Sequence, residues 1–252
     1  MAKIVARNWR FPTIGFATHT GGRENNEDGL LAARTKKGIL LAVADGLGGH
    51  AGGEVASALA LRALAEKQND DLRVAINHAH NKIVAQQPSQ IIAKEAKNRS
   101  KDEEAKLMAT TLTAVHIAGS QAHFGHVGDS KLFLFRSNKI SQLSEDHTAA
   151  QEMRKHGMVN IPAQAEHRLS QSLGIFKPVP QIGNTQLEKG DVLLLCTDGL
   201  TASVTQNRIK AICLTLPPLK AVQMLIKTAN EQGKTVYKGK HDNITAIVYR
   251  HE

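Results

Sequence analysis

Hydrophobic residues in this chain form short unbroken runs that end at acidic residues. Residues 40–44 are all apolar and precede Asp45, and residues 192–196 are all apolar and precede Thr197 and Asp198. Strands buried on both faces have continuous apolar runs, whereas strands with one solvated face alternate. Both segments are therefore predicted to be fully buried strands that carry a carboxylate at or just past their ends.

The rest of the pattern predicts two blocks of strands, each followed by helices. Strands are expected at residues 13–18, 29–34, 38–44, 111–118, 122–127, 131–136, 181–187, 191–197 and 244–249. Helices are expected at residues 54–67, 72–86, 206–214 and 219–232. This order indicates an α+β domain with a layered core.

Two stretches lack a regular pattern. Residues 87–106 are polar and charged, which suits an exposed helical or loose connection. Residues 146–180 combine a short helix, Gly157, prolines and several histidines, which predicts an irregular surface flap. Neither stretch divides the chain, so we expect a single domain over residues 1–252, with the flap as an insertion.

Short acidic motifs recur at the ends of the predicted strands. They are Asn26-Glu27-Asp28, Asp45-Gly46, Asp198-Gly199 and Asp242-Asn243. Each one alone is more simply explained as a turn, because Asp-Gly and related pairs favour turns. Together, and with two of them after fully apolar strands, they predict a cluster of acidic oxygens. Hard divalent cations require such ligands.

The predicted hairpins allow a test of proximity from the sequence. If Lys36 and Lys37 form a two-residue loop, Thr35 pairs with Gly38 and Asp28 falls opposite Asp45, with Cβ atoms roughly 5 Å apart. A longer loop would shift this register by a residue or so. In a second hairpin, pairing of residues 118 and 121 places Thr110 across from Asp129, a fifth carboxylate.

This ligand set favours Mg²⁺ or Mn²⁺. There is no cysteine in a metal-binding motif and no histidine pair spaced for ligation, which excludes a structural zinc site. Two such ions about 3.5–4 Å apart can share one water, lower its pKa and hold it for attack on phosphorus. Arg23 precedes Asp28 by five residues, and its planar guanidinium suits phosphate. Alone, Arg23 would be a solvated surface residue; beside the acidic motifs, it indicates phosphoester hydrolysis.

Composition limits the class of protein. The chain has 252 residues, of which 41% are hydrophobic, so it can bury a sizeable core. No stretch approaches the roughly 20 apolar residues that cross a bilayer, and the basic first eleven residues lack a following signal core. We therefore expect a cytoplasmic protein without a membrane partner. Cys196 and Cys213 are expected to be small buried hydrophobic residues.

The net charge of +9 raises the possibility of nucleic-acid binding. However, Lys and Arg are spread along the chain, and only 4% of residues are aromatic, which leaves few side chains for stacking on bases. The charge therefore favours acidic or phosphorylated partners, or it is a solvated face. We expect no nucleic-acid partner.

The ordered motifs resemble those of the metal-dependent protein phosphatases, the PPM or type 2C family of serine/threonine phosphatases, in its compact bacterial form. The similarity extends from about Gly15 to Tyr249. The motifs are Arg23-x-x-Asn26-Glu27-Asp28, Asp45-Gly46-x-Gly48-Gly49-x-x-x-Gly53-Glu54-x-Ala56-Ser57, Thr110-Thr111, Gly128-Asp129-Ser130, Thr197-Asp198-Gly199-Leu200 and Asp242-Asn243-Ile244-Thr245.

The resemblance implies a four-layer αββα sandwich of two antiparallel sheets flanked by helices, with a dinuclear Mg²⁺ or Mn²⁺ centre at one edge. It implies hydrolysis of phosphoserine and phosphothreonine in proteins, and substrates that a serine/threonine kinase supplies to a monomeric enzyme. Asp45 would bridge both metals and Arg23 would bind phosphate. The remaining implied ligands are the Gly46 carbonyl with Glu27 or Asp28 at one metal, Asp198 and Asp242 at the other, and Asp129 at a weaker third ion.

The chain departs from the family pattern at a few positions. Leu47 stands where many eukaryotic members have a histidine that is a proposed general acid. His50 is the nearest substitute, although a lone histidine in a glycine-rich turn is more often structural, and metal-bound water is the alternative acid. Lys131 replaces a frequent arginine, and Ala109 replaces a frequent glycine. None of these changes removes an implied metal ligand.

Two other functions fit the same motifs. A phosphoprotein-binding regulatory module could keep the fold and lose catalysis, although degenerate relatives usually lose acidic residues first. A metallohydrolase could act on small phosphoesters, because the metals act on the phosphoryl group and the flap would choose the rest of the substrate.

Overall fold

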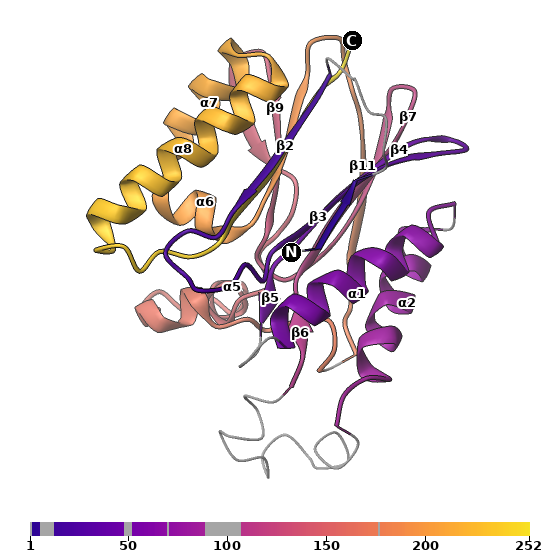
Figure 1. Ribbon diagram of the computed structural model, residues 1–252, viewed down its shortest axis with the longest axis vertical. Helices are drawn as coiled ribbons and strands as arrows, with labels where there is room; N and C mark the ends of the chain where they lie inside the picture. Colours follow the sequence, from indigo (N-terminus) through magenta and orange to yellow (C-terminus); the bar gives the residue numbers. More distant parts are fainter. Residues whose placement is uncertain (1, 6–12, 48–51, 70, 89–106, 176) are drawn as a thin grey trace.

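The computed structural model describes residues 2–5, 13–47, 52–69, 71–88, 107–175 and 177–252. Two β-sheets pack face to face, and helices cover the outer face of each (Figure 1). The helices and sheets form four layers in the order α, β, β, α, and the hydrophobic clusters lie between them. The predicted αββα sandwich is therefore confirmed.

The first sheet has the strand order β1-β3-β4-β7-β8-β11. Its strands are β1 (Ala2–Val5), β3 (Gly29–Thr35), β4 (Gly38–Ala44), β7 (Leu112–Ala118), β8 (Gln121–Val127) and β11 (Gln181–Gln186). Every neighbouring pair is antiparallel except β1 and β3, which run parallel. The two antiparallel sheets expected from the resemblance are therefore present, and β1, an edge strand that was not predicted, adds one parallel pair.

The second sheet has the strand order β10-β9-β12-β13-β2 and is antiparallel throughout. Its strands are β2 (Ile14–His19), β9 (Lys131–Arg136), β10 (Lys139–Gln142), β12 (Val192–Cys196) and β13 (Ile244–Arg250). A short third pair joins β5 (Gly46–Leu47) to β6 (Ala109–Thr110). The short edge strand β10, which follows the turn at Ser137 and Asn138, was not predicted.

The apolar runs are buried on both faces, as predicted. In β4, Leu40 and Ala42 pack toward the helices, whereas Leu41 and Val43 pack toward the other sheet. In β12, Leu194 packs toward helices and its neighbours Leu193 and Leu195 pack between the sheets. Both faces of these strands leave water, which is why no polar residue interrupts either run.

Helices α1 (Gly52–Glu66) and α2 (Leu72–Val84) cover the first sheet, and α6 (Asp198–Ser203), α7 (Gln206–Thr215) and α8 (Pro218–Val236) cover the second. Asp71 caps α2 by accepting a 2.7 Å hydrogen bond from the Arg73 backbone N–H. The four predicted helices are confirmed to within a few residues at each end. The short helix α6 was not predicted.

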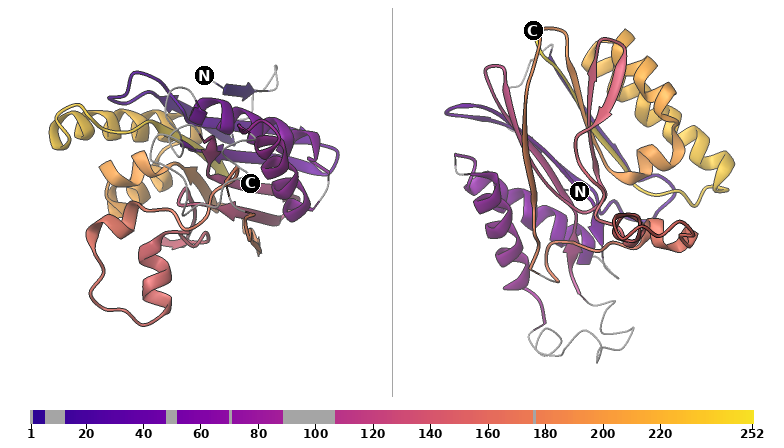
Figure 2. Two further views of the ribbon diagram at one scale, coloured as in Figure 1. Left: turned by 90° about the horizontal axis from the view of Figure 1, so that it is seen from below. Right: turned by 180° about the vertical axis from the view of Figure 1, so that it is seen from behind.

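Residues between β10 and β11 stand out from the layers (Figure 2). They include α5 (Ala149–Lys155), capped by Thr148, and the 3₁₀ helix η2 (Ala163–His167). Isolated bridges from Thr148 to Leu169 and from Thr110 to Leu173 attach this segment to itself and to β6. The short helix predicted in this segment is thus present. Most of the polar connection predicted at 87–106 lies outside the described residues.

The predicted hairpin registers can be compared with the structure. Thr35 pairs with Gly38 and the ladder continues to Gly29 opposite Ala44, so Asp28 and Asp45 follow at the same end, as predicted. The second ladder ends at Leu112 opposite Val127. The placement of Thr110 across from Asp129 is wrong because Gly128, with φ of +108°, turns the chain, and Thr110 pairs with Gly46 instead.

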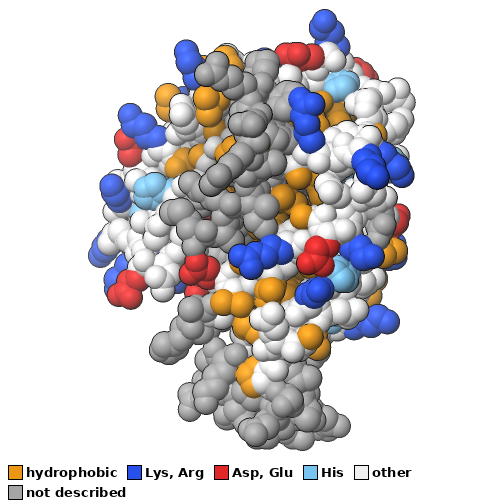
Figure 3. Space-filling view, turned by 45° about the vertical axis from the view of Figure 1, so that its right-hand side comes forward, with side chains coloured by type: hydrophobic (Ala, Val, Ile, Leu, Met, Phe, Trp, Pro, Cys, Tyr) orange, Lys and Arg blue, Asp and Glu red, His pale blue; other side chains and the backbone are white. Residues whose placement is uncertain are grey.

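Lys and Arg side chains are spread singly over the face shown in Figure 3, with Asp and Glu between them. On the described part of this face they do not gather into one continuous stripe. No described helix combines the length and the apolar character that crossing a membrane requires. Both cysteines are free and buried, as expected.

Candidate active site

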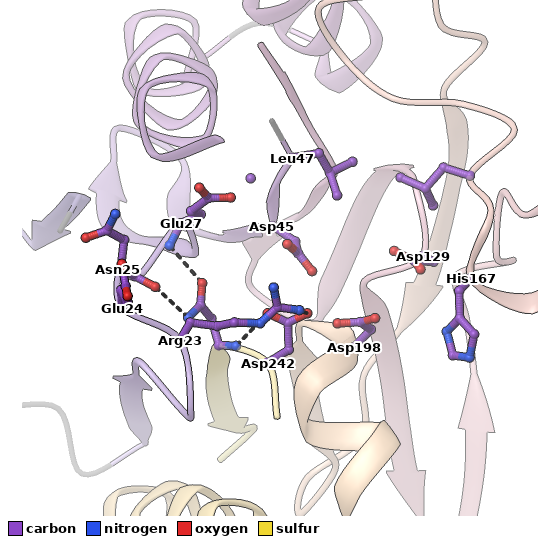
Figure 4. Close-up of a pocket in the computed structure, with 13 residues that line it drawn as sticks. Arg23, Glu24, Asn25, Glu27, Asp45, Leu47, Asp129, His167, Asp198 and Asp242 are labelled. Atoms are coloured by element: carbon purple, nitrogen blue, oxygen red, sulfur yellow. Dashed lines mark hydrogen bonds and ion pairs between the residues drawn. The ribbon is translucent and has the colours of Figure 1, made fainter. Parts of the chain in front are cut away.

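A cavity of about 710 Å³ opens at the end of the sandwich where β4 and β12 end and β3 and β13 begin. Polar and acidic side chains line most of it (Figure 4). The lining residues are Arg23, Glu24, Asn25, Glu27, Asp45, Gly46, Leu47, Asp129, His167, Leu169, Asp198, Asp242 and Asn243. Among the described residues, every metal or phosphate ligand expected from the sequence lines this cavity except Asp28.

Asp45 follows β4 and is held through its backbone by the threonine pair on the neighbouring segment. Its N–H donates to the Thr111 hydroxyl at 3.0 Å. Its carbonyl accepts from the Thr111 N–H at 2.9 Å and from the Thr110 hydroxyl at 2.9 Å. The Thr111 hydroxyl also hydrogen-bonds the Ser130 hydroxyl at 2.8 Å. These bonds fix the backbone from which the Asp45 carboxylate reaches into the cavity.

Gly46 and Gly53 allow close contact between β5 and the start of α1. A Cβ atom on Gly46 would lie 2.2 Å from the Gly53 carbonyl oxygen, and one on Gly53 would lie 2.4 Å from Glu27 Oε2. Only glycine fits at such distances. The contact brings the Glu27 carboxylate beside Asp45 and Gly46, where all three border the cavity.

Asn243 fixes the loop that carries Arg23 and Glu27. Its side-chain oxygen accepts from the Glu27 N–H at 2.8 Å, and its amide nitrogen donates to the carbonyls of Thr20 and Asn25 at 2.7 and 2.9 Å. The neighbouring Asp242 pairs with the Arg23 guanidinium at 2.8 Å. The sequence motif Asp242-Asn243 therefore combines a carboxylate that faces the cavity with an amide that positions the loop opposite.

Asp28 lies behind the cavity wall. It is buried, and Oδ2 accepts a 2.8 Å hydrogen bond from the Thr197 hydroxyl, while Oδ1 has no partner among the described residues. The sequence left open whether Glu27 or Asp28 serves a metal. In the structure Glu27 lines the cavity, whereas Asp28 is buried, does not line it, and keeps one unpaired oxygen.

Asp129 lies in the turn between β8 of the first sheet and β9 of the second. The Lys131 ammonium donates to the Asp129 carbonyl at 3.0 Å and pairs with Asp146 at the start of the flap. Asp198, the first residue of α6, faces the cavity from the second sheet. Carboxylates from both sheets thus meet at one end of the molecule.

The carboxylates repel one another strongly. Burial, followed by the charges of Asp28, Asp198, Asp129 and Asp242, raises the pKa of Asp45 well above its usual range. Burial raises the pKa of Asp28 and of Asp129 to about 7, and burial and Asp242 raise the pKa of Asp198 and of Glu27. Arg23 and Lys131 neutralise only part of this charge. The site therefore favours bound cations.

The residues present fit hard divalent cations that keep some of their water. The donors are carboxylates and backbone carbonyls, with an unpaired buried oxygen at Asp28. Among the described residues, no three His, Cys, Asp or Glu side chains form a metal site by themselves. Mg²⁺ typically binds one or two carboxylates and retains several waters, so this arrangement suits it and excludes a closed structural zinc site.

Leu47, which stands where many eukaryotic members have a histidine, is partly exposed and lines the cavity wall, and His50 lies outside the described residues. Several other cavity residues were not found from the sequence. The imidazole that does line the cavity is His167, on the flap, near Asp129 in Figure 4. The only sequence signal for it was the group of histidines within residues 146–180. Glu24, Asn25 and Leu169 carried no signal.

Comparison with known proteins identifies relatives along most of the chain. The family described as protein phosphatase 2C matches residues 17–235. The serine/threonine protein phosphatase PstP of Mycobacterium tuberculosis is 32% identical over 241 residues, which are 90% of this chain and 42% of that protein. Protein phosphatase PhpP of Streptococcus pneumoniae is 31% identical over 234 residues, covering 90% of this chain and 92% of that protein. The chain thus spans less than half of the PstP sequence it matches.

Solved structures share the fold. A crystal structure of M. tuberculosis PstP superposes with a TM-score of 0.77 at 29% identity, covering 95% of this chain and 99% of that one. The catalytic domain of PstP in complex with two manganese ions superposes with a TM-score of 0.75 at 30% identity, covering 94% and 98%.

Proposed function

Because the chain belongs to the protein phosphatase 2C family, we propose that it hydrolyses phosphoserine and phosphothreonine in proteins with Mg²⁺ or Mn²⁺. One observation carries the proposal: carboxylates from the ends of both sheets converge with Arg23 on a single cavity. Divalent ions there supply a water of lowered pKa and positive charge for the phosphoryl oxygens. The manganese-bound PstP domain supports this choice of metal.

Asp45 is the residue best placed to serve two ions. After burial, the charges of Asp28 and Asp198 are the largest that raise the pKa of its carboxylate, so both lie near it. We assign the Gly46 carbonyl and Glu27, with Asp28 behind it, to one ion, and Asp198 and Asp242 to the other. Asp129, farther along the wall, suits a third and weaker ion.

Arg23 binds and orients the phosphoryl group. Its guanidinium borders the cavity, is half exposed, and is held beside Asp242 by their 2.8 Å ion pair. A metal at Asp242 would neutralise that carboxylate and leave the remaining guanidinium donors for phosphate oxygens. The flap contributes His167 and Leu169 to the opposite wall, which supports a role for residues 146–180 in choosing the substrate.

A phosphopeptide panel assayed with Mn²⁺, Mg²⁺ and chelator tests this function. We expect metal-dependent release of phosphate from phosphoserine and phosphothreonine peptides and from p-nitrophenyl phosphate, and little from phosphotyrosine. Strong preference for small phosphoesters over peptides would instead indicate a small-molecule hydrolase. Binding of phosphopeptides without turnover would indicate the regulatory module.

Substitution of Asp45 separates catalysis from folding. Asp45→Asn keeps the backbone clamp of Thr110 and Thr111 and removes the charge between the two ions, so activity should fall roughly 100-fold or more. Glu231→Gln, at an exposed site on α8, is the control and should retain activity. Normal turnover by folded Asp45→Asn protein would refute the assignment of Asp45.

A further inference from the structure

A second depression of about 220 Å³ lies beside the main cavity. The two share Arg23, His167, Asp198 and Asp242, so a molecule bound at the phosphate position borders both. The remaining wall comes from α6 and from the residues that follow α8. We call this depression the side pocket. Beyond the shared residues, its wall has no role in the proposed metal or phosphate binding.

The turn after α8 gives the side pocket a defined shape. The Tyr237 hydroxyl donates to the Ala202 carbonyl at 3.0 Å, which ties the end of α8 to α6. The chain then reverses through Lys238 and Gly239, with φ of 52° and 80°, and the Lys240 N–H donates to the Tyr237 carbonyl at 3.0 Å. Lys240 is thereby placed in the pocket wall.

The same turn packs against the loop that carries Arg23. The Gly22 N–H donates to the His241 carbonyl at 3.0 Å, and a Cβ on Gly22 would lie 1.7 Å from the Gly239 carbonyl oxygen. The two loops are thus in direct backbone contact. A second cation, Lys240, consequently lines the same pocket as Arg23, the cation assigned to phosphate binding.

The two cations differ in their partners. Arg23 pairs with Asp242, whereas the exposed Lys240 ammonium makes no ion pair with any residue that the structure describes. Lys234 adds positive charge nearby, because it helps to lower the pKa of His241 after burial and His19. Arg23 and Lys240 balance the charges of Asp198 and Asp242 in the pocket wall, so a divalent ion held by these carboxylates would leave the wall positively charged.

We propose that the side pocket binds an acidic side chain of the substrate adjacent to its phosphorylated residue, with Lys240 as the charge partner. This inference rests on the proposed function. Extended peptide advances about 3.3–3.6 Å per residue, so a neighbour of the phosphoresidue reaches the adjoining pocket. Lys240 is then a specificity-determining residue that selects the sequence around the phosphate and does not take part in the reaction.

The test compares phosphothreonine peptides that carry Asp, Ala or Lys at the positions flanking the phosphoresidue. Wild-type enzyme with Mn²⁺ should show a kcat/KM roughly tenfold higher for the Asp peptide than for the Lys peptide, mainly through KM, and the ratio should shrink as salt is added. Lys240→Glu should invert this order, and Lys240→Gln should remove it. Lys227→Glu, an equal charge change at an exposed site on α8, should keep the wild-type order.

The outcomes distinguish failure of the side-pocket proposal from failure of the proposed phosphatase function. Wild-type enzyme that hydrolyses p-nitrophenyl phosphate but treats the three peptides alike overturns the side-pocket proposal alone. The same holds if Lys240→Glu retains the wild-type order. Absence of p-nitrophenyl phosphate hydrolysis with either metal overturns the proposed function and this inference with it. If Lys240→Glu fails to fold, as judged by thermal melting, the Lys240→Gln ratio decides.

Discussion

Thr111 is buried, and its hydroxyl joins the Asp45 N–H to the Ser130 hydroxyl. A buried backbone donor that loses its acceptor costs about 1–3 kcal/mol, because no water replaces the bond. Thr111 contacts no ion or substrate in our assignment, so its effect on the site would come through the position of Asp45.

Thr111→Val should therefore lower the free energy of unfolding by about 1–3 kcal/mol and weaken Mn²⁺ binding. Urea denaturation and calorimetric titration with Mn²⁺ measure the two effects separately. Thr215→Val is the matched control, since its hydroxyl bonds an exposed helix carbonyl on α7. Equal Mn²⁺ affinity in Thr111→Val and wild type would show that the clamp on Asp45 is dispensable.

His126 is the buried residue with the clearest pH signature. Burial lowers the pKa of His126 from 6.5 to about 3, and its ring lies between Thr113, at 2.8 Å, and His147. Above pH 6.5 the His126 ring is neutral in both the folded protein and the unfolded chain. Between pH 6.5 and 3 only the unfolded chain takes up the proton, so acid removes stability, at up to about 1.4 kcal/mol per pH unit.

His126→Gln should lack this contribution, and its unfolding free energy should fall less steeply between pH 6 and pH 4.5 than that of wild type. Urea denaturation across this range measures the slopes. His156→Gln, at an exposed site, should keep the wild-type slope. Parallel slopes for wild type and His126→Gln would contradict a buried neutral ring.

At the level of single residues, the acidic candidates could be predicted because each follows or precedes a recognisable strand. The choice between Glu27 and Asp28 could not, because it depends on which side chain reaches the cavity across Gly46 and Gly53. His167 was missed for a similar reason: a residue on an irregular segment has no periodicity that indicates where it lies.

At the level of elements, β5 and the start of α1 pack more closely than any side chain allows. A methyl group on Gly46 would meet the backbone of both Gly53 and Glu27. Gly46→Ala should therefore destabilise the protein by about 1–3 kcal/mol and shift Glu27 away from Asp45.

Thermal melting and Mn²⁺ titration check this expectation. Gly52→Ala is the control one residue before Gly53, because its methyl group would meet Met108 at an ordinary 3.5 Å. A Gly46→Ala protein as stable as Gly52→Ala would mean that the two elements separate easily and that the contact does not position the site.

The elements found from the sequence were the long and strongly patterned ones. Apolar runs in β4 and β12 and the register of the β3–β4 hairpin were predictable because burial on both faces and a two-residue turn leave few alternatives. The elements β5 and α6 have two and six residues, too few to show a period, and β10 is a polar edge strand.

At the level of the whole molecule, the pairing of β12 with β9 and β13 joins segments far apart in the chain. Nothing local in the sequence specifies that order, and the family resemblance implied the two sheets but not the order of their strands. The meeting of Asp45 with Asp198 depends on this arrangement, because the two residues belong to different sheets.

The clustered carboxylates should make metal binding compete with protons. Burial raises the pKa of Asp28 and of Asp129 to about 7 in the metal-free folded protein, from 3.8 for an ordinary aspartate. Between these two pH values both groups are protonated in the folded protein and ionised in the unfolded chain. Stability of the metal-free protein from these groups therefore rises as pH falls from 7 toward 4. Metal binding requires the opposite, deprotonated state.

Mn²⁺ should accordingly raise the melting temperature by about 5–10 °C at pH 8 when it is near 100 times its dissociation constant. The increment should fall by half or more at pH 5.5. Scanning calorimetry with Mn²⁺ or chelator at both pH values measures it, and Asp45→Asn should show little increment at either. An increment that does not change with pH would contradict proton competition at this site.

The origin of the acidic side chains has a mechanical consequence. Asp45 follows β4 of one sheet and Asp198 follows β12 of the other, and the Asp129 turn joins β8 of the first sheet to β9 of the second. An ion shared by Asp45 and Asp198 would crosslink the sheets at this end without a covalent bond. Resistance of that end to proteases and to pulling forces would then follow the divalent-cation concentration of the surroundings.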